Sequence, residues 1–419
     1  MNPYKIGFFG LFGQKNWGNE CSLQAIIYYM RKHHPDWEIY CVCTVPGDTS
    51  TRYGIPAFPI HSISSNHNIL LGKSSPITKS VKKIFYHIKN ELAHWIKMYR
   101  TLKGSQMVIA PGTGLLTDFR GDIYGRCYET FKLSILAKFC GCKLMFVSIG
   151  AGPIRHPVNR WFVKSALSRA DYRSYRNNSS KKYMEDIGFK SSNDPIYPDL
   201  AFSLPKIVIP ECRAKDRQRP VIGVGVADGI VGVMAYNGKS NFTERSEIIY
   251  REYIDKICSF VTWLLEHKYI VRILMGDTEH DSIPKEELKN QLTKRGYNYE
   301  DGNIFDEPIT SVDHLLSQVA ATDVVISPRF HNIILALMLN KPVISISYHD
   351  KFSSLMAEMG LENYCLHTTD LNIEELIELF KKLMANADEI KQQIETNIKD
   401  NVLALEKQYS ILFNNVPIV

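Results

Sequence analysis

Residues 324–339, which read VVISPRFHNIILALML, contain the strand-to-helix corner that decides the fold. An apolar strand ends at Ser327, and an apolar helix begins near His331. An apolar strand followed at once by a helix is typical of a parallel sheet that helices cover. Open α/β proteins bind their ligands at the carboxyl edge of such a sheet. The corner therefore predicts both a fold class and the place of a site.

The same alternation recurs along the chain and predicts an α/β protein with two doubly wound, Rossmann-like domains. Further strand-like runs, each followed by a Gly-rich or polar turn, lie at 5–11, 106–110, 143–148, 171–175, 221–226, 270–275 and 342–346. We expect an N-terminal domain at 1–204, a polar linker at 205–220, a C-terminal domain at 221–371 and helices at 372–419. Asn372 is predicted to cap the first of these helices. The two domains are expected to face each other across a cleft.

The composition fits a two-domain globular protein, because 45% of the 419 residues are hydrophobic and 22% are charged. The nine cysteines follow no hydrophobic leader and show no zinc spacing, so we expect buried thiols in a reducing compartment. No apolar run is long enough to span a bilayer. The sequence therefore predicts a cytoplasmic protein, whose membrane association would be peripheral and on the inner face of the cell membrane.

The formal net charge of +6 is concentrated in one segment. Residues 73–103 carry eight Lys and Arg residues against a single acidic one, Glu91, so the rest of the chain sums to −1. Apolar residues follow a helical spacing there: Val81, Ile84, Phe85, Ile88, Leu92, Trp95, Ile96 and Tyr99. They predict a basic amphipathic helix over about 77–103.

Two interpretations of this basic helix remain open. It either packs on the core with a solvated lysine face, or contacts an anionic bilayer surface or a lipid-diphosphate substrate. RNA-binding signatures are absent from the segment, so no nucleic-acid partner is expected.

The corner at 324–339 also brings a cation and a titratable group together. Arg329 beside helix-start amides is suited to bind phosphate or carboxylate, and His331 can transfer a proton at neutral pH. The alternative is that both side chains only tie the turn to neighbouring groups. His280 and Asp281 offer two metal ligands without a third, so no metal site is expected.

Two Gly-containing turns lie at other strand ends. Gly112 and Gly114 either let the backbone approach a ligand closely or simply form a tight turn. The loop GQKNWGNE at 13–20 carries small and amide residues that suit a hydroxyl-rich ligand such as a sugar. Within it, Trp17 either stacks on a sugar ring or plugs the loop. The spacing matches neither the dinucleotide nor the P-loop fingerprint.

Taken together and in order, these motifs resemble the polysaccharide pyruvyl transferase family. The resemblance rests on GQKNWGNE at 13–20, APGTGLL at 110–116, SIGAGP at 148–153, ADYRSYR at 170–176, Pro198–Asp199, and Ser327-x-Arg329-x-His331. It runs from the first strand to about residue 350. It implies a fold of the GT-B type, phosphoenolpyruvate as donor, and as acceptor a sugar of a cell-surface polysaccharide or its lipid-linked precursor, in exopolysaccharide or capsule assembly.

The resemblance also implies roles for single residues. Arg329 and His331 would be catalytic, with Arg329 on the donor's phosphate or carboxylate and His331 as general acid. Further donor contacts are expected from Arg176, Ser327, Gly112 and Gly114. Acceptor contacts are expected from Asn16, Trp17, Asn19 and Glu20. Phosphoenolpyruvate would be a co-substrate, with no cofactor and no metal.

Two other functions remain open on the residues alone. The first is a GT-B-type glycosyltransferase that uses a nucleotide sugar. The second is a non-catalytic sugar-binding or membrane scaffold protein.

Overall fold

The computed structural model describes residues 4–61, 76–118, 123–205, 219–227 and 244–413. For helix residues 76–85 and 244–246 it describes the backbone only. The predicted linker at 205–220 lies almost wholly outside the described residues. Within them the chain divides into two compact units. Unit 1 comprises 1–14, 29–176 and 180–195, and unit 2 comprises 15–28, 177–179 and 196–419. Residues 15–28 thus cluster with the second unit.

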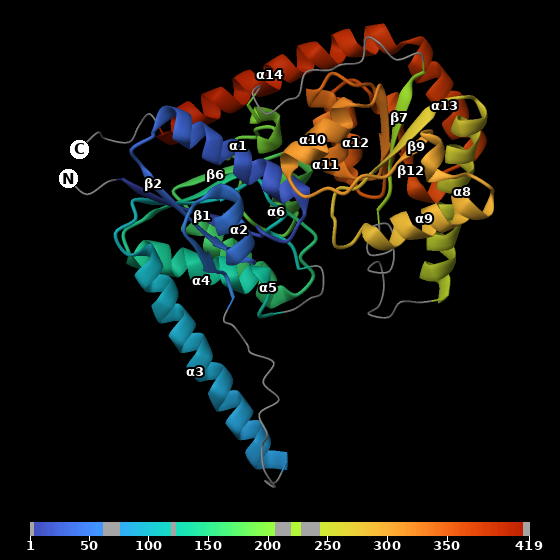
Figure 1. Cartoon of the computed structure of the whole chain (residues 1–419). Helices are drawn as coiled ribbons and strands as arrows, with labels where there is room; N and C mark the ends of the chain where they lie inside the picture. Colours follow the sequence, from blue (N-terminus) through green and yellow to red (C-terminus); the bar gives the residue numbers. More distant parts are fainter. Residues whose placement is uncertain (1–3, 62–75, 119–122, 206–218, 228–243, 414–419) are drawn as a thin grey trace. The chain divides into compact units, whose positions relative to one another are not determined.

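Unit 1 is built on a parallel six-stranded sheet (Figure 1). Its strands are β1 (Lys5–Gly10), β2 (Glu38–Cys43), β3 (Ala57–Pro59), β4 (Met107–Pro111), β5 (Lys143–Ile149) and β6 (Tyr172–Tyr175). The helices that connect these strands are α1 (Trp17–His33), most of which clusters with unit 2, α2 (Pro46–Tyr53), α3 (Pro76–Leu102), α4 (Arg126–Phe139), α5 (Pro157–Ser168) and α6 (Asn178–Asp186). The strand order β3-β2-β1-β4-β5-β6 is the Rossmann order, which reverses between β1 and β4.

Unit 2 repeats this plan in a second parallel six-stranded sheet. Its strands are β7 (Val221–Gly225), β8 (Ile270–Leu274), β9 (Ile304–Phe305), β10 (Val324–Ser327), β11 (Val343–Ser347) and β12 (Cys365–His367). Its helices are α8 (Glu244–Glu266), α9 (Ser282–Lys294), α10 (Val312–Ala320), α11 (Phe330–Met338), α12 (Asp350–Glu358), α13 (Ile373–Ala385) and α14 (Ala387–Phe413). The order β12-β11-β10-β7-β8-β9 is the same Rossmann order, here reversing between β7 and β10.

The fold class predicted from the sequence is confirmed by these two doubly wound sheets. Buried strands such as β10, whose four residues are all buried, explain the continuous apolar runs. Asn372 caps α13 as expected, because its Oδ1 accepts the amide of Glu375 at 3.1 Å. Cys41 and Cys43 are buried on β2, whereas Cys140 is only partly buried. Among the described residues, no helix is both long and apolar enough to cross a bilayer.

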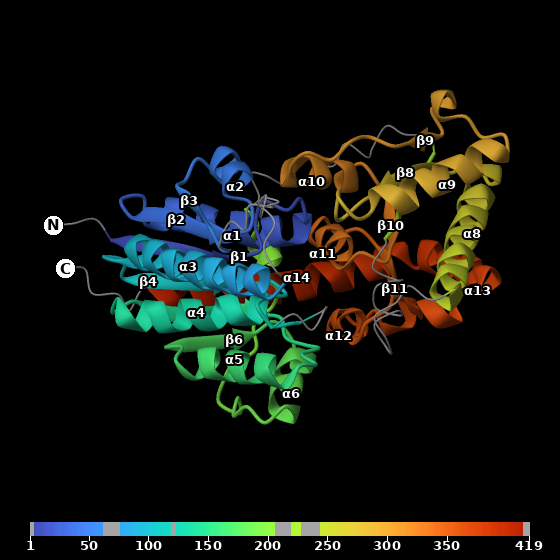
Figure 2. The same cartoon turned by 90° about the horizontal axis from the view of Figure 1, so that it is seen from below.

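The basic helix α3 lies alongside α4 and contributes to the core of unit 1 (Figure 2). Met98 and Leu102 are buried in that core, and Trp95 packs against it. A buried polar cluster joins the same two helices. The Lys132 ammonium of α4, fully buried, lies 2.8 Å from Glu91 and 2.7 Å from Glu129. The inner face of α3 therefore matches the core-packing interpretation.

His94 of α3 completes this cluster in one protonation state. Its Nδ1 lies 2.9 Å from Lys132 Nζ, and its Nε2 lies 3.2 Å from the carbonyl oxygen of Pro59. An ammonium only donates, so Nδ1 must accept while Nε2–H donates to Pro59. Burial lowers the pKa of His94, and the neighbouring Lys132 cation lowers it further. The folded protein therefore holds a neutral imidazole between α3 and α4.

The stability of the folded protein should therefore depend on pH through His94. Unfolded, the imidazole takes up its proton near pH 6.5, whereas the folded protein delays uptake to lower pH. The unfolded state then binds more protons, so the free energy of unfolding falls as pH drops below about 6.5. We expect His94→Gln, which keeps an acceptor and a donor but cannot titrate, to show a smaller loss in denaturant titrations between about pH 8 and about pH 5.

The matched control for this comparison is His87→Gln, at an exposed position of the same helix. It should keep the pH dependence of the wild-type protein. An identical pH slope in the wild-type and His94→Gln proteins would contradict the assignment.

Candidate active site

The strand-to-helix corner of unit 2 lies where the order of its sheet reverses. Ser327 ends β10 next to Gly225 of β7, and a Cβ at Gly225 would lie only 2.0 Å from Ser327 Oγ. The buried Ser327 Oγ accepts the amide of Arg329 at 3.0 Å and Asn332 Nδ2 at 3.3 Å. These bonds set the turn into α11. The hydroxyl of Ser327, which the sequence predicts as a donor contact, is thus buried and bonded within the turn.

Arg329 is held at this corner by a buried carboxylate from the neighbouring loop. Its Nε donates to Asp281 Oδ1 at 2.9 Å, and its Nη2 bonds to the same oxygen. Asp281 Oδ2 accepts the amides of Gly276 and Asp277, both at 2.9 Å. Asp281, which the sequence offered only as half of a metal site, is thus the counterion of Arg329. Among the described residues, the remaining Nη1 makes no hydrogen bond, which leaves it for a ligand.

The ion pair keeps the guanidinium charged. Burial acts against the charged form of Arg329, but Asp281, Tyr348 and Asp277 together outweigh it and raise the pKa of Arg329 above its ordinary value. Burial raises the pKa of Asp281 as well, while Arg329 and the two backbone amides act in the opposite direction. With 15% of its side chain exposed, Arg329 is a cation that is oriented from behind and open on one side.

His331, in the first turn of α11, has a carboxylate partner of its own. Its Nε2 lies 3.7 Å from Asp199 Oδ2. Asp199 is buried at the start of the short helix η1 (Leu200–Ser203), where its Oδ1 accepts the amide of Ala201 at 3.0 Å. On the other side of the ring stands Gly18 of α1, where a Cβ would lie 1.9 Å from His331 Nδ1. Sequence reasoning gave no role to Asp199, although Pro198–Asp199 was among the motifs.

The loop that begins α1 joins the same corner. Asn16 Nδ2 donates to Asp277 Oδ2 at 2.9 Å, and the Trp17 amide donates to the carbonyl of Gly276 at 3.1 Å. Trp17 Nε1 bonds to Thr278 Oγ1 at 2.7 Å, and the whole residue is buried. Trp17 therefore plugs the loop, and its ring cannot stack on a sugar in this structure.

The four predicted acceptor contacts thus differ in exposure. Glu20 is fully buried, like Trp17, whereas Asn16 and Asn19 are partly exposed. The two amide side chains are the members of this set that can meet a ligand from solvent.

The remaining predicted donor contacts belong to unit 1. Gly112 has a positive φ of 43° and donates to the carbonyl of Val147 at 2.8 Å. The amide of Gly150 donates to Thr113 at 3.3 Å, and a Cβ on Gly150 would lie 2.8 Å from the Arg176 guanidinium. The turn that contains Gly112 and Gly114 therefore meets the Gly150 loop and Arg176 at the carboxyl edge of the first sheet. Arg329 and His331 occupy the equivalent edge in unit 2.

Lys351 is a further cation that sequence reasoning missed. It lies in the first turn of α12, just after β11, and its Nζ is 5.3 Å from the ring centroid of Phe330, the neighbour of His331. A basic residue after a strand end was its only signal.

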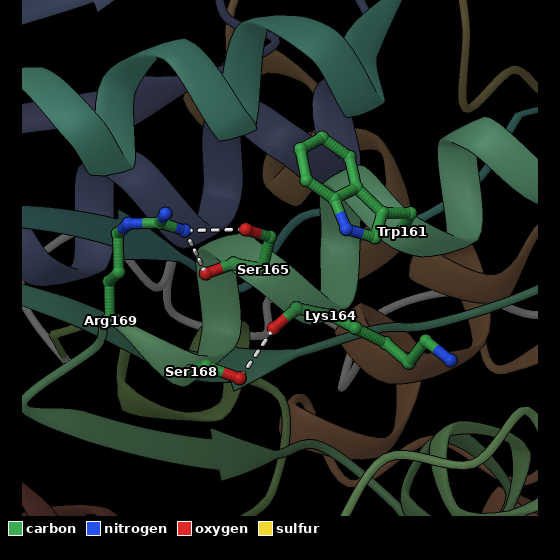
Figure 3. A pocket seen from close by; sticks show the side chains of 5 residues that line it. All are labelled: Trp161, Lys164, Ser165, Ser168 and Arg169. Atoms are coloured by element: carbon green, nitrogen blue, oxygen red, sulfur yellow. Dashed lines mark hydrogen bonds between the residues drawn. The ribbon is translucent and has the colours of Figure 1, made fainter.

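A shallow depression on α5 contains none of the candidate site residues. Its lining consists of Trp161, Lys164, Ser165, Ser168 and Arg169 (Figure 3). There Lys164 and Arg169 are bonded to Ile187 and Ser165.

This geometry can be compared with known proteins. A family model described as polysaccharide pyruvyl transferase matches residues 16–350. The chain belongs to the polysaccharide pyruvyl transferase family. The match includes Arg329, His331, Asp281 and Asp199, so the whole corner lies inside the family's region. A search of proteins with curated function returns no match.

Solved structures share the fold of this pyruvyl transferase family member at low sequence identity. HepE from Anabaena, in complex with UDP and glucose, is 14% identical with a TM-score of 0.59, and the alignment covers 99% of this chain and 100% of HepE. A putative UDP-N-acetylglucosamine 2-epimerase from Listeria monocytogenes is 12% identical, TM-score 0.58, with 98% and 96% covered. A glycosyltransferase from Rickettsia africae is 12% identical, TM-score 0.56, with 99% and 100% covered. These likenesses establish a GT-B-like fold.

The described residues of this family member contain no group of three or more His, Cys, Asp and Glu side chains that could hold a metal ion. His280 Nδ1 instead lies 3.1 Å from Asp277 Oδ1, and Asp281 is engaged by Arg329. The corner offers an anchored guanidinium and an imidazole backed by a carboxylate, which together suit anion binding and proton transfer.

Removing the carboxylate behind Arg329 should destabilise unit 2 strongly. In Asp281→Asn the guanidinium stays buried without its counterion, and breaking a buried pair in this way costs about 3–5 kcal/mol. Denaturant unfolding should show that loss. Glu378→Gln, which breaks an exposed pair with Lys381, should change the free energy of unfolding by less than about 1 kcal/mol. Equal losses of unfolding free energy in the two variants would mean that the buried Arg329–Asp281 pair contributes no more to stability than an exposed pair.

Proposed function

We propose that the protein transfers a pyruvyl group from phosphoenolpyruvate to a sugar of a cell-surface polysaccharide or of its lipid-linked precursor. The observation that carries the proposal is the corner itself, where Arg329 and His331 stand two residues apart, each backed by a buried carboxylate. Membership of the pyruvyl transferase family supports this reaction class. We place the reaction in the cytoplasm, in accord with eight free thiols among the described residues.

Phosphoenolpyruvate presents a phosphate and a carboxylate on a three-carbon enol, so its binding site needs fixed cations. Arg329 can offer Nη1 while Asp281 holds its other nitrogens, so the guanidinium is oriented before the ligand arrives. Lys351 can supply a second positive charge after the adjacent strand. The first amides of α11 add partial positive charge, as at other anion-binding helix starts. Arg176 and the Gly112–Gly114 turn in unit 1 are proposed as further donor contacts.

The proposed chemistry balances without a cofactor. A sugar hydroxyl forms a bond to C2 of the enol while a proton adds to C3, which turns the methylene into a methyl group. The resulting phosphate-bearing ketal then loses inorganic phosphate, and a second hydroxyl closes a cyclic ketal. Phosphate leaves by cleavage of its bond to C2. Of the two hydroxyl protons, one replaces the proton taken up at C3, and the other leaves on the inorganic phosphate.

His331 is the proposed source of the proton at C3. An imidazolium has the acidity for this task near neutral pH. Asp199 Oδ2 lies 3.7 Å from Nε2, where a carboxylate stabilises the positive charge and orients the ring. Gly18 leaves room for the imidazole on the other side. We therefore propose Asp199 as the positioning residue of the general acid.

The proposed acceptor contacts are Asn16 and Asn19, whose partly exposed amide groups both donate and accept hydrogen bonds. Asn16 is fixed by Asp277, so its remaining hydrogen-bonding capacity points in a defined direction. Amide side chains of this kind are suited to sugar hydroxyls.

Acceptor-dependent release of phosphate from phosphoenolpyruvate tests the proposal. His331→Gln cannot deliver the proton, and loss of a general acid lowers rates by about 10²–10⁴-fold. His314→Gln, at an exposed histidine of the same unit, should keep full activity. Undiminished turnover in His331→Gln, with its fold intact by circular dichroism, would remove His331 from the mechanism.

The donor site can be tested separately through Lys351. Lys351→Gln should raise the KM for phosphoenolpyruvate about tenfold or more, because a charge-assisted bond to the anion is lost. Lys382→Gln, at an exposed lysine of α13, is the control.

Thermal-shift measurements with phosphoenolpyruvate and with UDP-sugars decide the donor, since a bound ligand raises stability. A shift with UDP-sugars alone would favour a glycosyltransferase. Binding of a sugar acceptor with no turnover of any donor would favour a scaffold protein.

A further inference from the structure

The outward face of α3 carries an apolar stripe that the fold of unit 1 does not bury. Ile88, Leu92 and Ile96 have exposed fractions of 53%, 59% and 52%. Their spacing of four residues places them along one side of the helix. Phe139 at the end of α4, which is 79% exposed, extends this surface, because its ring packs edge-to-face on Tyr99 of α3 at 6.0 Å. The core-packing interpretation therefore accounts for only one face of the helix.

Cations border this stripe. Lys89, Lys97, Arg100 and Lys103 are all exposed on α3 or just after it. With 3.6 residues per turn, three of them (Lys89, Arg100 and Lys103) fall within about 80° of Leu92 around the helix axis. The sequence of α3 towards its start adds Lys79, Lys82 and Lys83.

The single acidic residue of this segment is turned away from the stripe. Glu91 Oε1 accepts Lys132 Nζ at 2.8 Å and the hydroxyl of Tyr128 at 2.9 Å, both from α4. His94 and Trp95 bind the same helix, through Lys132 and Tyr128. These bonds fix the rotation of α3 about its own axis. They neutralise its carboxylate and leave an outward surface on which the described charged residues are cationic.

We propose that this surface, formed by Ile88, Leu92, Ile96 and Phe139 with the bordering cations, binds an anionic lipid bilayer. Apolar side chains can enter the boundary between headgroups and acyl chains while the flanking cations meet anionic headgroups. A second copy of the chain would set the same cations against each other, and like charges oppose such pairing. Nucleic acid would leave the Ile and Leu side chains without apolar contacts.

This inference does not depend on pyruvyl transfer, since a bilayer would bind the surface whatever the reaction. Joined to the proposed function, it explains how a protein without a described spanning helix reaches an acceptor that is anchored in lipid.

The test is sedimentation of the full-length protein with phosphatidylcholine vesicles, with and without phosphatidylglycerol. We expect binding to the anionic vesicles that high salt weakens, because salt screens exposed charges. Lys89→Gln, Arg100→Gln and Lys103→Gln combined should weaken binding roughly 100-fold, from about fivefold for each cation near the surface. Ile88→Ser, Leu92→Ser and Ile96→Ser combined should also reduce it strongly.

Matched controls change the same residue types elsewhere. Lys381→Gln, Lys391→Gln and Lys399→Gln remove as many charges, and Ile248→Ser, Ile283→Ser and Leu403→Ser remove as many exposed apolar groups, all in unit 2. The controls should bind like the wild-type protein, and thermal unfolding should show that every variant is folded.

Equal binding to neutral vesicles, no binding at all, or binding that the α3 variants retain would overturn the proposal. So would self-association or RNA binding that the same variants abolish while vesicle binding is absent. Phosphate release with a water-soluble sugar acceptor should survive in the α3 variants, which separates this inference from the proposed reaction.

Discussion

The buried ion pair between Arg329 and Asp281 is the interaction on which the site depends. A guanidinium at a strand end would lose much of its hydration on burial, and a carboxylate bonded to two backbone amides compensates for that loss. Because those amides belong to Gly276 and Asp277, the pair also fixes the loop after β8. That loop in turn holds Asn16 and Trp17. One charge pair thus joins two strand ends of unit 2 to the start of α1.

Close packing of backbone supports the same corner. Gly225 allows Ser327 to approach β7, and Gly18 allows the His331 ring to lie against α1. At both positions a Cβ would come within about 2 Å of the neighbouring side chain, a distance that no packing adjustment of a few tenths of an ångström relieves. The positions of Ser327 and His331 therefore depend on two residues that lack side chains as much as on hydrogen bonds. The Asp199 carboxylate then lies close to the imidazole of His331, with Oδ2 at 3.7 Å from Nε2.

The two faces of helix α3 have different surroundings. The inner face packs Met98 and Leu102 into the core and binds α4 through the Lys132 cluster, whereas the outer face exposes Leu92 and its neighbours. A helix that only covered a core would bury its apolar stripe and expose polar residues. Helix α3 instead buries some of its apolar residues and exposes others, so it both covers the core and presents an apolar surface to solvent.

The sequence by itself determined the fold class, the capping of α13 by Asn372 and the position of Arg329 and His331 at a strand-to-helix corner. These features depend on local patterns, namely the burial of parallel strands and the chemistry of helix ends. Only the tertiary structure decided that Trp17 is buried, that Asp281 neutralises Arg329 and that Asp199 accompanies His331. Those partners lie far apart in the chain, and the sheet order that brings them together follows from packing rather than from spacing. Likewise, helical periodicity located the stripe of α3, but only its packing against α4 decided which apolar residues stay exposed.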